Sequence, residues 1–182
     1  MGKTSFRTLN LWALFVVLLE FGSTASAQHN MQTSDQADQS KLVQAVRNAT
    51  QQYLDINNAI AAGYGPFLGC VSGSDHGAMG VHYVNPALLN GTVDAAHPQA
   101  LIYEPSPNGQ MKLVGVEFIT FADAWLKNNS GPPVLEGQVF LLVGSPNRFN
   151  IPAFFELHVW AWRNNPQGFF VDWNDHVSCA AQ

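Results

Sequence analysis

The sequence predicts an α+β fold, in which one long N-terminal helix packs on a curved antiparallel sheet of five to six strands, shaped as a cone or partial barrel. Three observations predict this fold. Apolar residues recur at helical spacing over residues 40–62, and an Asn-Gly pair separates two strand-like runs in the middle of the chain. A second pair of strand-like runs lies near the C-terminus.

The first 27 residues have the pattern of a secretory signal peptide. Lys3 and Arg7 give a positive start, residues 11–19 are an unbroken apolar run, and Ala25-Ser26-Ala27 is a cleavage site of small residues. The apolar run is shorter than the roughly 20 residues that span a bilayer. We therefore expect a secreted or periplasmic protein, with an N-terminal membrane anchor as the alternative.

Residues 28–39 are polar and have no apolar period, which predicts a flexible N-terminal arm before a single globular domain at 40–182. Without Lys3, Arg7 and Glu20, six basic and twelve acidic residues remain, a net charge of −6. This charge disfavours nucleic acid and anionic membrane surfaces as partners. No apolar run after residue 27 is long enough to span a membrane.

The helix is predicted by apolar residues that follow one another at intervals of four and three: Leu42, Val46, Ala49, Tyr53, Ile56 and Ile60. This spacing places them on one face of an amphipathic helix over roughly 40–62. Gly63 is a suitable C-cap, and Pro66 cannot continue the helix. The apolar face needs a sheet or another helix to cover it.

Asn108-Gly109 predicts the first hairpin, because it separates two β-rich runs at 100–105 and 111–120. Residues 138–143 and 81–84 are further strand candidates, and residues 121–127 could form a helical turn. Near the C-terminus, residues 153–163 and 169–174 flank a five-residue loop, which predicts a second hairpin.

Alternate residues of a strand share a face, so this second hairpin has two very different sides. One side is apolar and should lie under the helix: Phe155, Leu157, Val159 and Ala161. The other side mixes aromatic and polar residues: Glu156, His158, Trp160, Trp162, Phe170, Asp172 and Asn174, with His176 beyond the strand.

Aromatic walls with a few convergent polar groups are typical of ligand pockets. We therefore expect the mixed side to be the concave face of the sheet and to line a pocket for a small ligand, which Trp160, Trp162, Phe170 and Asn174 would contact. The alternatives are a surface used for dimerisation and a face covered by residues 121–135.

Cys70 and Cys179 are the two cysteines of the chain. In an oxidising compartment, an isolated pair of this kind predicts a disulfide. The bond would close a long loop and stabilise the fold by about 4–5 kcal/mol in the chain-entropy description. Thiolate metal ligands are the alternative, but the pair lacks C-x-x-C spacing.

Several histidines and strand-borne glutamates point to a metal site. The predicted ligands are His76, His82 and His158, with Glu117 or Glu156 as the carboxylate. Glu117 lies inside an apolar run, where a carboxylate is unfavourable unless it is paired or bound. Imidazole and carboxylate suit Zn, Cu, Fe or Mn. No short-range ligand signature such as H-E-x-x-H supports the set.

Two other functions remain open at this point. In a metal-free acid–base enzyme of the lyase or isomerase type, His158 would act with Glu156, Asp172 or His176 as base and orienting partner. In a non-catalytic binding module, the aromatic side would hold an apolar ligand or a protein partner. Convergence of the carboxylates on His158 distinguishes an enzyme or metal site from a plain binder. The sequence leaves open whether the protein is an enzyme.

Two stretches of the chain, AIAAGYGPFLGCVSGSDHGAMGVHYVN and LHVWAWRNNPQGFFVDWNDHVSC, resemble segments of exported bacterial proteins of no assigned function. The resemblance covers most of residues 42–179. It implies export from a bacterium and a single domain, and it carries over no activity and no catalytic residue.

Overall fold

The computed structural model describes residues 1–3 and 41–181. The predicted signal peptide at 1–27 and the predicted arm at 28–39 lie almost entirely outside the described residues, so both stay predictions. Within the described part of the chain, no helix is long and apolar enough to cross a membrane.

Residues 41–50 form an α-helix that continues into a 3₁₀ turn, η1 (Gln51–Leu54). A separate short helix, α2 (Ile56–Ala61), follows after a break at Asp55. Asp55 is extended, and its side chain accepts a hydrogen bond of 3.0 Å from the backbone N–H of Asn57. The prediction of one long helix is therefore wrong, because Asp55 ends the first helix and caps the next one.

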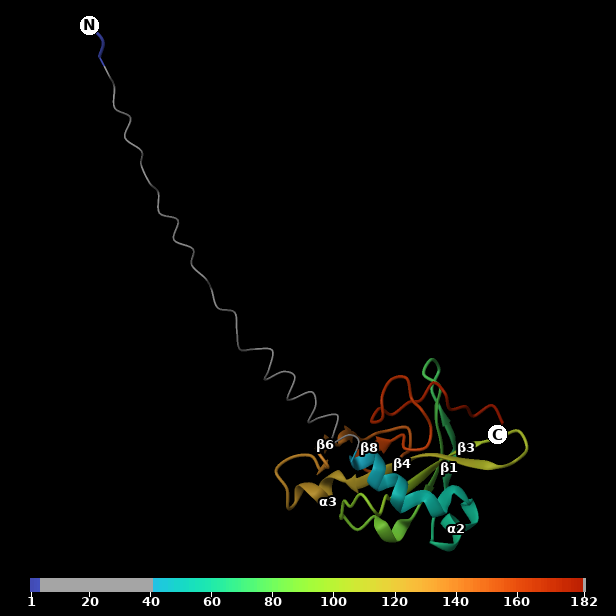
Figure 1. The fold of residues 1–182 in the computed structure, drawn as a ribbon. Helices are drawn as coiled ribbons and strands as arrows, with labels where there is room; N and C mark the ends of the chain where they lie inside the picture. The colour runs from blue at the N-terminus through green and yellow to red at the C-terminus, as the bar shows by residue number, and fades with distance from the viewer. Residues whose placement is uncertain (4–40, 182) are drawn as a thin grey trace.

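The sheet is curled and antiparallel, with six strands in the order β1-β2-β3-β4-β8-β7 (Figure 1). Its strands, in chain order, are β1 (Gly65–Ser72), β2 (Ala78–Val84), β3 (Ala100–Pro105), β4 (Met111–Phe121), β7 (Leu141–Val143) and β8 (Phe154–Val159). The prediction of an α+β fold with five to six antiparallel strands is confirmed. Three smaller pieces accompany the sheet: a 3₁₀ turn η2 (Pro86–Leu88), and the two-stranded pair of β5 (Val134–Leu135) and β6 (Gln138–Val139).

The Asn-Gly hairpin is confirmed, since β3 and β4 pair antiparallel on either side of it. Gly109 has a φ of 78°, the left-handed conformation that such a turn requires. The predicted helical turn is α3 (Ala122–Leu126), directly after β4. The predicted strand at 138–143 is divided between β6 and β7.

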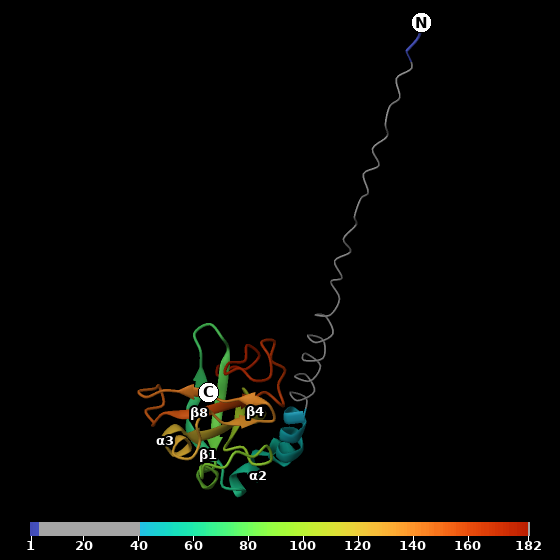
Figure 2. The ribbon, with the colours of Figure 1, turned by 90° about the vertical axis from the view of Figure 1, so that its left-hand side faces the viewer.

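The helix at 41–50 covers one face of the sheet (Figure 2). Leu42 and Val46 are fully buried in the same apolar cluster as Phe118 and Leu157. The four β8-side residues predicted to face the helix all belong to this cluster: Phe155, Leu157, Val159 and Ala161. That prediction is confirmed, and the helix-side face is the main core of the protein.

The second predicted hairpin is wrong. β8 ends at Val159, and residues 169–174 form no strand with it; the nearest pairing in that segment is an isolated bridge between Asn174 and Ala78. The chain turns at Trp160, whose indole N–H donates a hydrogen bond of 2.6 Å to the carbonyl oxygen of Val171. β8 pairs instead with β4 and β7, so the strand next to His158 comes from elsewhere in the chain.

Cys70 and Cys179 form a disulfide, as predicted, across a sequence separation of 109. The bond joins β1 to the C-terminal segment, and both views show the turn between β1 and β2 beside that segment (Figures 1 and 2). A carboxylate oxygen of Glu104 on β3 also accepts a hydrogen bond of 3.0 Å from the backbone of Ser178. The C-terminal residues are therefore held against the sheet.

Candidate metal centre

Three strands bring His82, Glu117 and His158 together on the sheet face opposite the helix. Glu117 on β4 lies directly across from His158 on β8. Their neighbours Phe118 and Leu157 belong to the helix-side core, so alternation directs Glu117 and His158 to the other face. His82 reaches the same place from β2.

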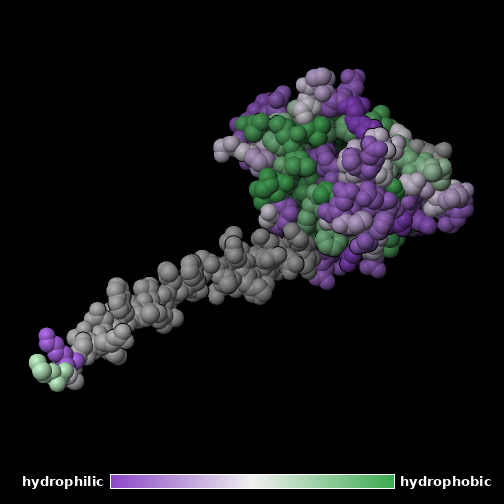
Figure 3. All heavy atoms as spheres, turned by 90° about the horizontal axis from the view of Figure 1, so that it is seen from above, coloured by the Kyte–Doolittle hydropathy of each residue, from purple (hydrophilic) through white to green (hydrophobic). Residues whose placement is uncertain are grey.

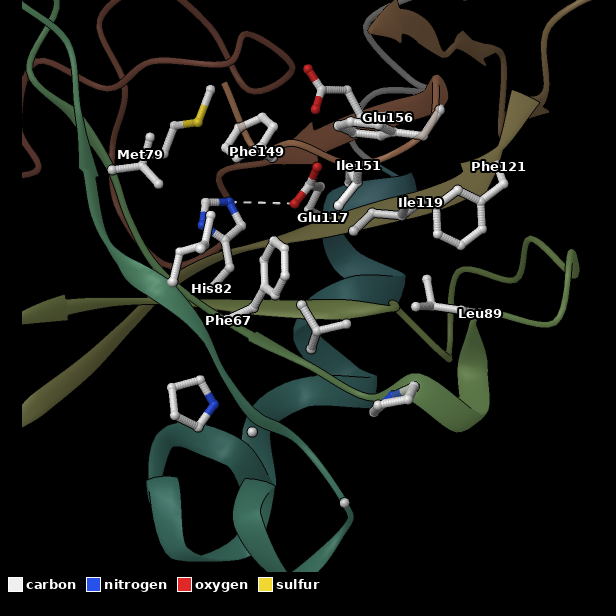
Figure 4. A pocket seen from close by; sticks show the side chains of 18 residues that line it. Phe67, Met79, His82, Leu89, Glu117, Ile119, Phe121, Phe149, Ile151 and Glu156 are labelled. Atoms are coloured by element: carbon white, nitrogen blue, oxygen red, sulfur yellow. Dashed lines mark ion pairs between the residues drawn. The ribbon is translucent and has the colours of Figure 1, made fainter. Parts of the chain in front are cut away.

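The three side chains are close enough to share one ion. One ligand atom from each residue can be chosen so that all three atoms lie within 4.8 Å of one another. His82 Nε2 is 3.3 Å from Glu117 Oε2, the contact drawn in Figure 4. The rings of His82 and His158 meet edge to face, with centroids 5.9 Å apart. All three residues are buried, so they form a buried His/Glu/His group that could hold a metal ion.

His158 is the most buried member of the group, with 1% of its surface exposed. Neither ring nitrogen has a hydrogen-bond partner among the described residues. Asp172 Oδ1 lies 3.6 Å from His158 Nδ1, close enough for an ion pair but too long for a hydrogen bond. Buried polar groups are normally hydrogen-bonded, so an unpartnered imidazole at this depth indicates a missing partner.

Trp160 fixes the ring of His158 from one side. The two rings stack with centroids 6.1 Å apart and planes inclined by 21°. Gly115 on β4 makes room for this arrangement, because a Cβ there would lie 2.9 Å from the carbonyl oxygen of Val159 and 3.2 Å from the Trp160 ring. The position of the imidazole is therefore set by packing before any ligand binds.

Glu156 and Asp172 extend the group. Together with His158 they form a second trio whose ligand atoms also lie within 4.8 Å of one another. Glu156 is two residues before His158 on β8, so it shares the same face. The two trios have His158 in common, so it is the centre of a cluster of two histidines and three carboxylates, of which only Asp172 is partly exposed.

Burial and mutual charge displace the pKa values of this cluster in different directions. Burial, aided by His158 and opposed by Glu117, lowers the pKa of His82 to about 4. Burial also acts to lower the pKa of His158, but the carboxylates of Glu117, Asp172 and Glu156 outweigh it and raise this pKa to about 9. Burial and the neighbouring Glu117 raise the pKa of Glu156 to about 9. These shifts favour the protonated form of His158 and the uncharged forms of His82 and Glu156.

A cavity of about 440 Å³ opens over the cluster. His82, Glu117 and Glu156 are the titratable residues of its lining, and almost all the others are apolar (Figure 4). Its walls come from β1, β2, β4 and β8, from the 3₁₀ turn η2 and from the segment before β8 that carries Phe149 and Ile151. This combination of apolar walls and few convergent polar groups is typical of a small-molecule site.

Other residues predicted for the site lie elsewhere. His76 is exposed in the turn between β1 and β2, outside both trios. His176 is exposed, with ring atom Nδ1 3.2 Å from the carbonyl oxygen of Asn164. None of the four predicted ligand contacts lines the cavity: Trp160, Trp162, Phe170 and Asn174.

The reason is the absent hairpin, since the chain leaves the sheet at Trp160. Trp162 packs against the helix-side core, and its indole N–H donates a hydrogen bond of 3.0 Å to the hydroxyl of Thr50. Phe170 packs against the same core. Asn174 is fully buried beside Ala78, and its side-chain oxygen accepts a hydrogen bond from the backbone of His176.

Sequence reasoning missed most of the apolar wall. Ile119 and Phe121 alternate with Glu117 along β4, so strand periodicity could have placed them on its face. Phe67 lies on β1, a strand that the glycine-rich sequence did not predict. Phe149 and Ile151 come from an irregular segment, for which no periodic signal exists.

Two histidines and one carboxylate can bind a transition metal and leave a coordination position for a water or a ligand, and two of these three residues, His82 and Glu117, line the cavity. A metal held in this way can polarise a bound oxygen and lower the pKa of a bound water. In comparisons with protein-family models, with curated proteins and with solved structures, no match to this chain was found.

Proposed function

We propose that this is an exported metalloprotein, in which His82, Glu117 and His158 hold one divalent transition metal ion at the base of the apolar cavity. The observation that carries the proposal is the buried imidazole of His158, which has no hydrogen-bond partner among residues 1–3 and 41–181 and lies beside a second histidine and a carboxylate. A bound ion would supply the missing partner.

The environment of each histidine supports this assignment. Histidines that bind metals usually direct their other ring nitrogen to a carboxylate or to the backbone. Asp172 lies beside Nδ1 of His158, which leaves Nε2 for the metal. The backbone of Gly80 acts to raise the pKa of His82, and Nε2 of His82 faces Glu117.

The nitrogen and oxygen donors of this group suit several first-row transition metals. Two imidazoles and one carboxylate with an open position occur in catalytic zinc sites and in non-haem iron sites, and the same ligands suit manganese and copper. The group contains no thiolate, because both cysteines are in the disulfide. Zinc and cobalt(II) are suitable test metals, since cobalt(II) takes zinc sites and gives a visible spectrum.

A metal-free acid–base centre is the second candidate. The raised pKa of Glu156 favours it, because a carboxyl that keeps its proton to higher pH can act as a general acid. In this case the imidazole of His82, in contact with Glu117, would serve as the base. The two functions differ in their need for metal, so one titration separates them.

The test uses the exported full chain, stripped with chelator and then titrated with zinc or cobalt(II). We expect one equivalent of metal per chain and an intense cobalt spectrum from a site of low coordination number. Glu117→Gln and His82→Gln should abolish binding. His97→Ala is the matched control, because His97 is exposed, pairs with Asp94 and belongs to neither trio.

Asp172→Asn distinguishes the two overlapping trios. If Asp172 orients His158, this change should weaken metal binding by roughly 10- to 100-fold without abolishing it. Loss of binding in Asp172→Asn with retention in Glu117→Gln would move the site to Glu156, His158 and Asp172. Failure of the wild-type chain to bind zinc, cobalt, iron(II), manganese or copper would refute the proposal.

A further inference from the structure

The inner end of the cavity contains all three titratable residues of the lining, together with the buried Val71, Met79 and Phe154, and its most exposed lining residues form an apolar mouth. Its inner end holds His82, Glu117 and Glu156, each at most 6% exposed. Phe67 and Leu68 line the same cavity from β1 and are 37% and 55% exposed. A molecule that enters must therefore pass apolar side chains before its leading end reaches the histidine and the two carboxylates.

The mouth is apolar at a cost in backbone strain. Leu68 has a φ of 58°, a left-handed conformation that is unfavourable for a leucine. It lies where the register of β1 against β2 is interrupted, between Phe67 and Val71. Glycine or asparagine would be easier to accommodate at this backbone position, so an apolar side chain here indicates a use at the cavity mouth.

The opposite rim is also apolar. Leu89 follows η2, and Phe149 and Ile151 come from the segment before β8, all three half-buried and lining the cavity. Figure 4 shows these side chains around the space over the His82–Glu117 contact. Apolar residues also gather on one side of the folded surface in the space-filling view (Figure 3). An occupant therefore meets apolar walls along its length.

We propose that the cavity takes an apolar molecule with a single oxygen-bearing head group, which enters head first and places its oxygen on the metal held by His82, Glu117 and His158. This inference rests on the proposed metal site. Three protein ligands leave a coordination position open, and oxygen donors fill such positions. The apolar body would lie against Phe67 and Leu68.

The size of the cavity agrees with such an occupant. A volume of about 440 Å³ is within the range of ligand pockets and exceeds what a few waters or a small inorganic anion would fill. A cationic head group is disfavoured, because it cannot coordinate the metal and would be buried beside it. A carboxylate and an alcohol share the required oxygen, and the experiment separates them.

The probes are decanoate, decanol and decylammonium, added to the cobalt(II)-loaded full chain. We expect decanoate or decanol to change the cobalt spectrum. Tighter binding of decanoate would identify an anionic head group, and tighter binding of decanol a neutral one. Decylammonium should leave the spectrum unchanged. Calorimetry should show at least tenfold tighter binding of the active probe to zinc-loaded than to chelator-treated protein.

Leu68→Asn tests the mouth, because asparagine tolerates the left-handed backbone and removes the apolar side chain. This change should weaken binding of the active probe at least threefold and leave the zinc content of the protein unchanged. Leu126→Asn is the matched control: Leu126 is 48% exposed at the end of α3, away from the cavity, and its change should leave probe affinity unchanged.

The results separate this inference from the metal site. Cobalt binding without a spectral response to decanoate or decanol overturns the inference and leaves the metal site intact. Equal binding of decylammonium, or equal affinity with and without zinc, overturns it as well. Absence of cobalt binding, seen before any probe is added, refutes the metal site itself.

Discussion

Glu117 and Phe118 are neighbours on β4, and both are almost completely buried, at 5% and 0% exposure. Phe118 faces the helix and packs with Leu157 in the main core. Glu117 faces the other way and meets His82 and His158. Burying a phenyl ring stabilises a fold, whereas burying a carboxylate destabilises it unless a partner compensates.

This comparison separates the two faces of the sheet by their energetics. The helix-side face is built from apolar residues, and their burial accounts for folding. The cavity-side face buries ionisable groups that folding does not need. The buried ionisable residues on the cavity side are best explained by binding. If so, a substitution on one face should leave the property of the other face unchanged.

The largest effect should come from the helix-side face. Phe118→Ala removes a fully buried ring, which also lies 6.5 Å from the ring of Phe140, and should lower the free energy of unfolding by about 4 kcal/mol. Denaturant unfolding of the metal-free protein measures it. The zinc content of the folded fraction should stay at one per chain, because Phe118 belongs to the helix-side core and is not one of the ligands. A loss of zinc from folded Phe118→Ala would show that the two faces are not independent.

The cavity-side face should respond to metal instead. At a free zinc concentration of about a hundred times Kd, binding should raise the free energy of unfolding by about 2.7 kcal/mol. Glu117→Gln should remove this increase, and Phe118→Ala should keep it. Thermal unfolding with and without zinc gives both values. Equal zinc stabilisation in Glu117→Gln would place the ion elsewhere.

The helix-side face could be predicted from sequence because its signals are local. The spacing of Leu42 and Val46 predicts a helix, and alternation predicts that Leu157 lies beneath it. Asn108-Gly109 predicts one hairpin from two adjacent residues. The break at Asp55 was missed because apolar spacing continues across it, while the capping hydrogen bond to Asn57 depends on a single backbone conformation.

The cavity-side face could be predicted only as a set of residue types. The sequence predicts His76, His82 and His158 as ligands, with Glu117 or Glu156 as the carboxylate, but it does not show which of them meet. Three separate strands bring His82, Glu117 and His158 together, and the pairing of Glu117 with His158 joins residues distant in the chain. The sequence pattern instead predicts that the strand of His158 pairs with residues 169–174, in a hairpin that does not form. Long-range strand order is set by the packing of the whole sheet, which period-2 alternation does not encode.

The pH dependence of the metal-free protein should be dominated by the cavity side. The pKa of His158 rises from 6.5 to about 9 and that of Glu156 from 4.5 to about 9 on folding. The folded protein therefore holds these protons more tightly than the unfolded chain, and the stability they contribute is lost as pH rises toward 9. His158 alone should lower the free energy of unfolding by about 2 kcal/mol between pH 7 and pH 9, and Glu156 should add to this fall.

Glu156→Gln provides the control for this pH effect, because it removes one titrating group while keeping its size. The free energy of unfolding should fall less steeply above pH 7 in this variant than in the wild-type protein. His82 acts in the opposite sense: its pKa falls from 6.5 to about 4, so its contribution is complete above pH 6.5 and is lost as pH drops through 4. A metal-free stability that rises from pH 7 to pH 9 would contradict the charge states assigned to His158 and Glu156.

The smallest effect concerns Thr120, the helix-side counterpart of His158. Its hydroxyl is buried and has no hydrogen-bond partner among the described residues, and it lies across from Phe155 in the apolar core. Thr120→Val keeps the shape and removes the unpartnered group, so it should raise the free energy of unfolding by up to about 1 kcal/mol and leave zinc affinity unchanged. Denaturant unfolding and a zinc titration measure the two quantities. If Thr120→Val instead destabilises the protein, a buried water must bind that hydroxyl. Water could then equally bind the unpartnered nitrogens of His158, and they would no longer indicate a metal. The zinc titration of Glu117→Gln would then decide whether the site binds metal.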